Sequence, residues 1–140
     1  MKKFIFVLGL LLFSVVIFAG AWKNTEKFIE YKKHKSIAKQ AEAEGNFDVA
    51  IKEYLICVEL AKNFSTPEIT AWCLNNVSFC LISKHKLTKK IELLKQALEY
   101  LAEAQQMGVE AVMPKILNNI SYCEYWFMYE EKRKETIKYK

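Results

Sequence analysis

Two pairs of adjacent asparagines are the residues whose type and spacing best suit binding chemistry in this 140-residue chain. They lie in two matching segments 43 residues apart, Leu74-Asn75-Asn76-Val77-Ser78-Phe79-Cys80 and Leu117-Asn118-Asn119-Ile120-Ser121-Tyr122-Cys123. A carboxamide both donates and accepts hydrogen bonds, so such pairs can bind the backbone of an extended peptide from both sides. Self-similarity with a period of about 20 to 50 residues is typical of stacked helical units. The motif therefore predicts a binding scaffold made of helical repeats.

No group of residues in the sequence suggests catalysis. A nucleophile, a base and an orienting group do not occur together, and His34 and His85 lack the spacing of metal ligands. We therefore predict a non-enzymatic protein without a metal or another cofactor. Lys2 and Lys3 account for two units of the formal charge of +5, and the remaining +3 is weak support for nucleic acid as a partner.

The first 21 residues have the pattern of a segment that directs export to the bacterial envelope. Met1-Lys2-Lys3 precedes an apolar run from Phe4 to Phe18, and Ala19-Gly20-Ala21 has the small-x-small form that signal peptidase accepts. We predict a cleaved signal peptide, a mature chain that begins at Trp22, and an exported protein in the periplasm or outside the cell. The alternative is a retained anchor in the inner membrane, because the lysines that follow the run resist translocation.

Residues 22–140 are predicted to form one helical domain. The spacing of apolar residues and the stop and start signals predict five helices. The first four run from Thr25 to a C-cap at Gly45, from an N-cap at Asp48 to about Ala61, from Pro67 to about Lys84, and from a cap at Thr88 to Gly108. The fifth is predicted to begin between Ala111 and Pro114. His85-Lys86-Leu87 is predicted to be a polar turn between the third and fourth helices. The polar residues after Glu130 suit the end of a repeat array, which no further unit covers.

One turn and the helix that follows it carry a family resemblance. The segment Ala43-Glu44-Gly45-Asn46-Phe47-Asp48-Val49-Ala50-Ile51-Lys52-Glu53-Tyr54, continued by Val58-Glu59-Leu60, resembles the tetratricopeptide repeat, which joins two helices through a Gly-polar-aromatic turn. Leu87 to Glu99 is similar to the same half-repeat, with Lys90 in place of the small residue, and the 43-residue spacing is similar to the longer repeats of kinesin light chains. The resemblance covers about residues 28 to 129. It implies an all-α, right-handed α-α superhelix of two full helix pairs and a terminal helix, preceded by the hydrophobic N-terminal segment.

In this family the first helices of successive units line a concave surface, so the resemblance also implies which side chains would bind a peptide. These are basic, amide and aromatic residues on three helices: Lys35, Lys39, Trp72, Asn75, Asn76, Phe79, Lys115, Asn118, Asn119 and Tyr122. Aromatic rings would hold the side chains of a bound segment, and ammonium groups would attract an acidic group or a C-terminal carboxylate. Lys35, Asn76 and Lys115 are similar to three of the five members of the carboxylate clamp found in co-chaperones of this family.

The same residue types also have simpler structural explanations. Lysines on a helix face are often only solvated, paired asparagines can satisfy interhelical hydrogen bonds, and Phe79 and Tyr122 can belong to the core. The four cysteines are predicted to be small buried residues, although Cys57 and Cys73, on neighbouring helices, could pair in an oxidising compartment.

The sequence therefore predicts an exported or membrane-anchored adaptor that binds a peptide segment or another protein on its concave face. The alternative is a structural homo-oligomer without a groove ligand. It is favoured by Tyr125-Trp126-Phe127-Met128-Tyr129, whose apolar rings surround the helix and indicate burial on more than one side.

Overall fold

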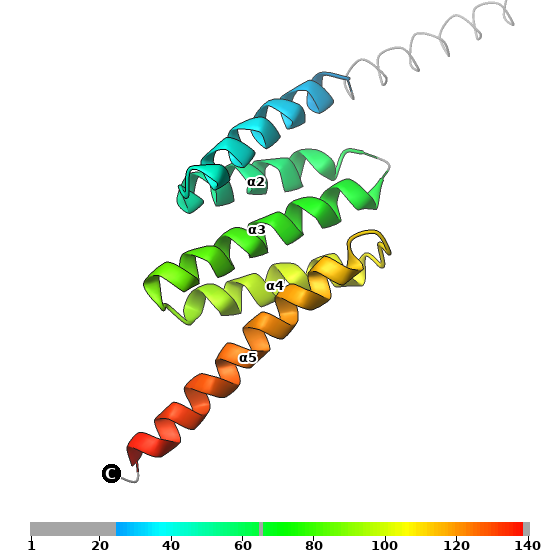
Figure 1. Cartoon of the computed structure of the whole chain (residues 1–140). Coiled ribbons are helices and arrows are strands. Elements are labelled where there is room, and N and C mark those ends of the chain that lie inside the picture. Colours follow the sequence, from blue (N-terminus) through cyan, green and yellow to red (C-terminus); the bar gives the residue numbers. More distant parts are fainter. Residues whose placement is uncertain (1–24, 65, 139–140) are drawn as a thin grey trace, which may run out of the picture.

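The structure is a computed structural model that describes residues 25–64 and 66–138. The predicted signal peptide or anchor, residues 1–21, and the predicted mature start at Trp22 lie outside the described residues. The described chain is all-α, as predicted, and its five helices are residues 25–43, α2 (Phe47–Ala61), α3 (Pro67–Thr88), α4 (Glu92–Gln106) and α5 (Met113–Lys138) (Figure 1). None of these helices combines the length and the apolarity that crossing a membrane requires.

A tight turn at Gly45 joins the first helix to α2, as predicted. Gly45 has a φ of +74°, a left-handed conformation that glycine adopts without strain. The N-cap of α2 is Asn46, whose side-chain oxygen accepts a hydrogen bond from the backbone N–H of Val49 at 3.4 Å. The predicted cap, Asp48, was wrong and lies in the first turn of α2. Asparagine and aspartate cap helices equally well, so the sequence alone does not distinguish two candidates this close together.

Helix α3 begins at Pro67, as predicted, but ends four residues later than predicted. His85-Lys86-Leu87 is not a turn but part of the helix, and Thr88 is its last residue rather than the cap of α4. Lys89 ends the helix with a φ of +57°, and its backbone N–H donates to the carbonyl oxygen of His85 at 2.7 Å. The His85 ring is buried and packs edge-on against Trp126 of α5, with ring centroids 5.5 Å apart. This contact with a residue of another helix stabilises the helical conformation at His85.

Helix α5 is one continuous helix, so the polar C-terminal segment does not form a separate helix. It begins at Met113, inside the predicted range of 111–114, and runs to Lys138. Gly108, with a φ of +65°, ends the preceding segment. Residues 131–138 are all exposed, and this end of α5 extends past the other helices (Figure 1).

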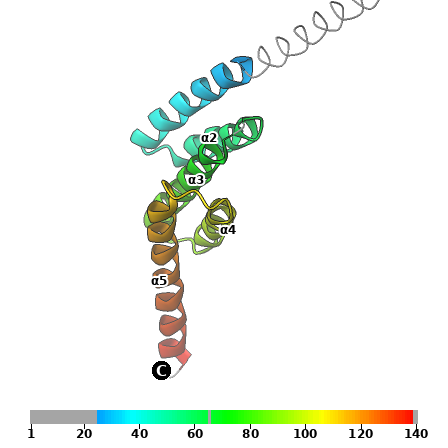
Figure 2. The ribbon, with the colours of Figure 1, turned by 90° about the vertical axis from the view of Figure 1, so that its right-hand side faces the viewer.

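The helices pack in chain order. Helix α2 packs against α3, α3 against α4, and α4 against α5, while α3 also contacts α5 directly. The first helix is tied to α2 by the Tyr54 hydroxyl, which donates to Glu42 at 2.9 Å. In the turned view, the first helix lies at one end of the array, and α5 extends from the other end (Figure 2). One core cluster joins all five helices through buried side chains that include Tyr31, Ala38, Tyr54, Leu74, Leu94, Leu101 and Ile116.

Candidate functional site

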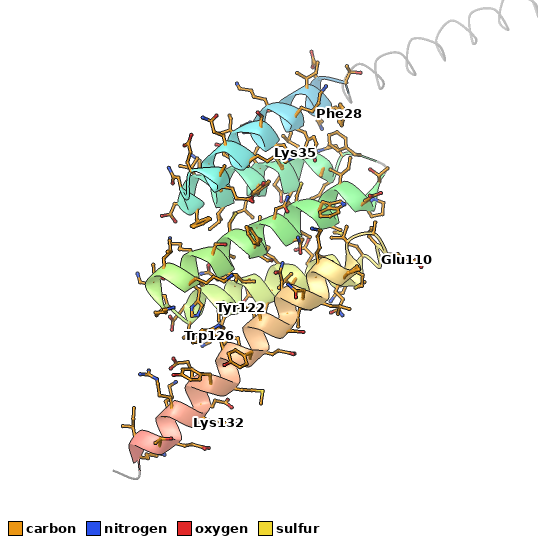
Figure 3. All side chains as sticks on the ribbon, in the orientation of Figure 1. Phe28, Lys35, Glu110, Tyr122, Trp126 and Lys132 are labelled. Carbon is orange, nitrogen blue, oxygen red and sulfur yellow. The ribbon has the colours of Figure 1, made fainter. Side chains whose placement is uncertain are left out.

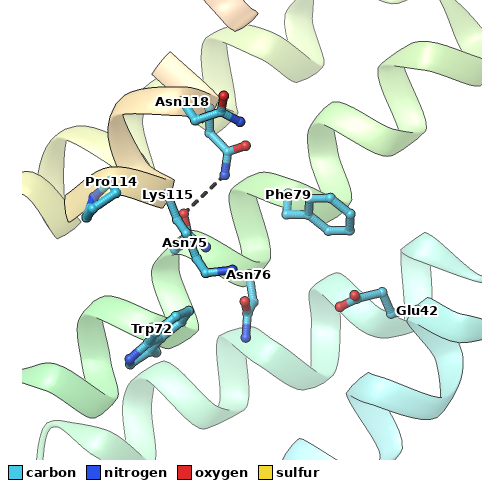
Figure 4. A pocket seen from close by; sticks show the side chains of 9 residues that line it. Glu42, Trp72, Asn75, Asn76, Phe79, Pro114, Lys115 and Asn118 are labelled. Carbon is cyan, nitrogen blue, oxygen red and sulfur yellow. Dashed lines mark hydrogen bonds between the residues drawn. The ribbon is translucent and has the colours of Figure 1, made fainter. Parts of the chain in front are cut away.

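An open cavity of about 450 Å³ lies between α3 and the first turns of α5 (Figure 4). We call it the α3–α5 cavity. Seven of the ten side chains predicted for the concave surface line it: Trp72, Asn75, Asn76, Phe79, Lys115, Asn118 and Asn119. Glu42 of the first helix and Pro114 of α5 complete the lining. The two copies of the repeated motif therefore contribute to the same cavity.

The four asparagines of this cavity divide into two kinds. The Asn119 Nδ2 donates to Asn75 Oδ1 at 3.1 Å, which joins α5 to α3, and these two residues are only 9% and 4% exposed. Interhelical bonding, the simpler explanation, therefore describes this pair. Asn76 is half-buried and Asn118 is exposed, so these two carboxamides remain at the cavity surface. Asn76 and Asn118 are the amides that a bound segment can reach.

Two aromatic rings form the apolar part of the cavity. Trp72 is half-buried, and the Lys115 ammonium lies 5.6 Å from the centre of its ring, within the range of a cation–π contact. The Phe79 ring is 41% exposed although it lies one residue before a buried cysteine of the same helix. One half-buried and one exposed ring beside amides give the cavity both apolar and hydrogen-bonding surface (Figure 4).

Glu42 is the charged residue of the cavity that the sequence analysis missed. Its carboxylate accepts hydrogen bonds from the Tyr54 hydroxyl at 2.9 Å and from the Cys80 thiol at 3.8 Å. Burial and the bond to Glu42 together raise the pKa of Tyr54 above its usual range. Burial, followed by the Glu42 charge, raises the pKa of Cys80 to about 12. The carboxylate is thus held in place by two protonated groups, and the cavity carries one negative and one positive side chain.

Lys35 and Lys39, predicted for the same surface, do not line the cavity. The Lys35 ammonium lies 5.4 Å from the centre of the Tyr31 ring, and Lys39 is exposed. Both residues share a helix face with Glu42, because residues spaced by three and four positions lie along one side of a helix. This spacing is the signal by which Glu42 could have been found. Of the three clamp-like residues, Asn76 and Lys115 meet in the cavity and Lys35 does not.

Tyr122, the remaining predicted residue, lies further along α5. Its ring is 4.9 Å from the Lys86 ammonium and 6.3 Å from the Trp126 ring. Figure 3 shows Tyr122 and Trp126 near each other on α5, far from Lys35 on the first helix. Burial raises the pKa of Tyr122. It therefore belongs to an aromatic group at the end of α3 rather than to the α3–α5 cavity.

All four cysteines are buried, as predicted, and all are free thiols. Cys57 and Cys73, the pair that the sequence placed on neighbouring helices, lie close enough for their thiols to hydrogen-bond. That bond and burial raise the pKa of Cys57 above the usual range of a thiol. No group of three or more potential metal ligands occurs in the part of the chain that the structure describes.

No protein-family model, curated protein or solved structure matches this chain. The chemistry of the α3–α5 cavity is therefore interpreted from the side chains that line it.

Proposed function

We propose that this protein is a non-enzymatic scaffold of the tetratricopeptide type, exported or membrane-anchored, that binds a peptide or a segment of another protein. The proposal includes a right-handed superhelix of two helix pairs and a terminal helix. The observation that carries it is the α3–α5 cavity, in which amides from both copies of one motif lie beside the rings of Trp72 and Phe79 on a single open surface.

The interhelical contacts support the repeat arrangement. Cys80 of α3 contacts Glu42 of the first helix across 38 residues of sequence, and Asn119 of α5 contacts Asn75 across 44 residues. These separations bracket the 43-residue period of the motif. The first helix contacts α3, and α3 contacts α5, at similar separations along the sequence. Stacked helical pairs produce this arrangement of alternate helices.

The chemistry of the cavity suits an extended peptide segment. The Asn76 and Asn118 carboxamides can each donate to and accept from a peptide backbone, which presents both groups along its length. Trp72 and Phe79 offer apolar surface for side chains, and Lys115 offers a charge for an acidic side chain or a C-terminal carboxylate. Glu42 disfavours a second acidic group at its end of the cavity, so we expect peptides with one acidic group rather than several.

The test uses a displayed library of random peptides and the double variant Asn76→Ala with Asn118→Ala. Peptides captured by the unchanged protein should bind the double variant at least tenfold more weakly, because about 1.4 kcal/mol is lost with two backbone-bonding amides. The matched control is Gln96→Ala with Gln105→Ala, two exposed amides of α4 outside the cavity. Circular dichroism should show equal helicity in all three proteins. Peptides that bind the double variant and the control alike would contradict the proposal.

A structural homo-oligomer is the second candidate function. It is favoured by the exposed apolar side chains of α5, among them Leu117, Tyr125 and Met128, on a helix that has no fully buried residue after Cys123. Sedimentation of the mature chain tests this candidate. A monomer at all accessible concentrations excludes it, whereas a dimer that Tyr125→Glu dissociates supports it.

A further inference from the structure

A second cavity, of about 580 Å³, lies further along α5, and we call it the distal cavity. Its walls are the end of α3, the turn into α4 and residues 126–134 of α5. No residue lines both this cavity and the α3–α5 cavity. The two surfaces therefore present separate chemistry.

Positive charge predominates around the distal cavity. Its charged side chains are Lys89, Lys90, Arg133 and Lys134, with two carboxylates, Glu92 and Glu130. Arg133 is paired with Glu130 through Nε at 3.1 Å and Nη2 at 3.0 Å. Among the described residues, Lys89, Lys90 and Lys134 form no ion pair. Helix α4 also begins here without a side-chain cap, so the positive end of its dipole faces the same region.

His85 supplies a second and independent observation. The residue lines the cavity and is only 2% exposed. Its Nδ1 lies 3.1 Å from the carbonyl oxygen of Lys90, which can only accept, so the ring proton is on Nδ1. Its Nε2 is buried and has no hydrogen-bond partner, the one such side-chain atom in residues 25–64 and 66–138. A buried nitrogen without a partner is costly, and in the neutral ring this nitrogen needs a donor.

We propose that the distal cavity binds free hydrogen phosphate. An anion that satisfies this site must accept hydrogen bonds from ammonium groups and also donate one to His85 Nε2. Hydrogen phosphate has oxygens for Lys89 and Lys134 and keeps one hydroxyl at neutral pH, whereas sulfate has none. A phosphate monoester has lost its last hydroxyl proton above about pH 6, so it lacks the donor as well. The free anion therefore fits the imidazole and the cations together.

Equilibrium dialysis against labelled inorganic phosphate at about pH 7.5 tests the proposal, because a monoester is fully ionised there. We expect saturable binding of one phosphate with a dissociation constant below about 10 mM. Sulfate and phenyl phosphate should bind at least about tenfold more weakly, since each leaves Nε2 without a donor. The chain has two histidines, and only the nitrogen resonance of His85 Nε2 should shift when phosphate is added.

The matched variants separate this site from general attraction of anions to a basic protein. Lys89→Gln with Lys134→Gln should weaken phosphate binding by about fivefold or more. Lys132→Gln with Lys138→Gln removes the same charge from exposed positions of α5 outside the cavity, and should change binding by less than about twofold. Equal losses in the two pairs, sulfate binding as tight as phosphate binding, or an unmoved His85 resonance would each overturn the proposal.

Discussion

The two copies of the repeated motif have nearly the same sequence and different environments. Leu74 on α3 is 0% exposed, whereas its counterpart on α5, Leu117, is 47% exposed. The Ser78 hydroxyl is fully buried and donates to two carbonyl oxygens, that of Leu74 at 3.0 Å and that of Ala97 on α4 at 3.1 Å. Ser121 is exposed and donates only to Leu117 at 2.9 Å. Helix α4 covers this face of α3, and within the described residues no helix covers the same face of α5. Whether a copy of the motif is buried therefore depends on the helices that pack against it.

The asparagines of the two copies have exchanged their roles. In α3 the first asparagine, Asn75, is buried and bonded, and the second is half-buried at the cavity. In α5 the first, Asn118, is exposed, and the second, Asn119, makes the interhelical bond. A small shift between the helices is enough to bring the second amide of one copy to the first amide of the other. The motif therefore supplies both the bond between repeats and the amides left for a ligand.

The largest expected difference between the copies concerns the leucines. Leu74→Ala removes a fully buried side chain and should lower the free energy of unfolding by about 2–5 kcal/mol. Leu117→Ala truncates a side chain that is already half in water and should cost no more than about 1 kcal/mol. Urea unfolding followed by circular dichroism measures both. Similar losses would show that α5 is covered in solution, which is the behaviour of an oligomer.

The next effect concerns the bond between the repeats. Asn119→Ala leaves the buried Asn75 oxygen without its donor and should destabilise the fold by about 1–3 kcal/mol. Asn118→Ala, one position away on the same helix, is exposed and should change stability by less than about 0.5 kcal/mol. The same unfolding measurement compares them. A larger loss of stability for Asn118→Ala than for Asn119→Ala would contradict the assignment of the interhelical bond to Asn119.

A smaller difference is expected for the serines. Ser78→Ala removes one hydroxyl that bonds α3 to α4, and we expect a loss of about 0.5–1.5 kcal/mol. Ser121→Ala removes a hydroxyl that bonds only its own helix and should be neutral within about 0.5 kcal/mol. Thermal melting of the two variants gives the comparison. A loss in Ser121→Ala equal to that in Ser78→Ala would contradict the difference in environment.

The smallest expected effect is kinetic and concerns the equivalent cysteines. Burial raises the pKa of Cys80 to about 12 and that of Cys123 to about 11, so both thiols are protonated and protected in the folded protein. Helix α5 has fewer buried contacts than α3 and should open locally more often. Cys123 should therefore react with a thiol reagent before Cys80, as mass spectrometry of timed samples can show. Simultaneous labelling would mean that the two helices open together.

The same two thiols predict a direction of pH dependence. Their pKa values are higher in the folded state than the value of about 8.5 in an unfolded chain. Their contribution to stability is therefore complete below about pH 8.5 and declines as the pH rises toward 11 for Cys123 and toward 12 for Cys80. Replacing Cys80 by alanine should therefore reduce the loss of stability over a wider range of alkaline pH than replacing Cys123 by alanine, because the pKa of Cys80 is higher.

The sequence predicted the parts of the fold that depend on strong local signals. Gly45, Gly108 and Pro67 mark helix ends because their backbone preferences act without help from distant residues. The end of α3 was not predictable in this way, because His85 is held in the helix by Trp126, a residue of another helix. The resemblance predicted that all four asparagines, Trp72 and Phe79 share one surface, but it also placed Tyr122 there, and it did not tell which asparagine of each pair would be bonded. Glu42 was missed because an acidic residue near a helix end has an ordinary solvated explanation.

The projecting end of α5 has a mechanical consequence. The buried side chains of this helix, Ile116, Asn119 and Cys123, all lie within two turns near its start. Trp126 and Phe127 are partly buried against the core, so residues 128–138 form an arm that extends about 16 Å beyond the last packed residue. A pivot of about 10° at the base of this arm would move its tip by about 3 Å. The arm lines part of the distal cavity, whereas the α5 residues of the α3–α5 cavity all precede it, so such a swing would change the width of the distal cavity alone.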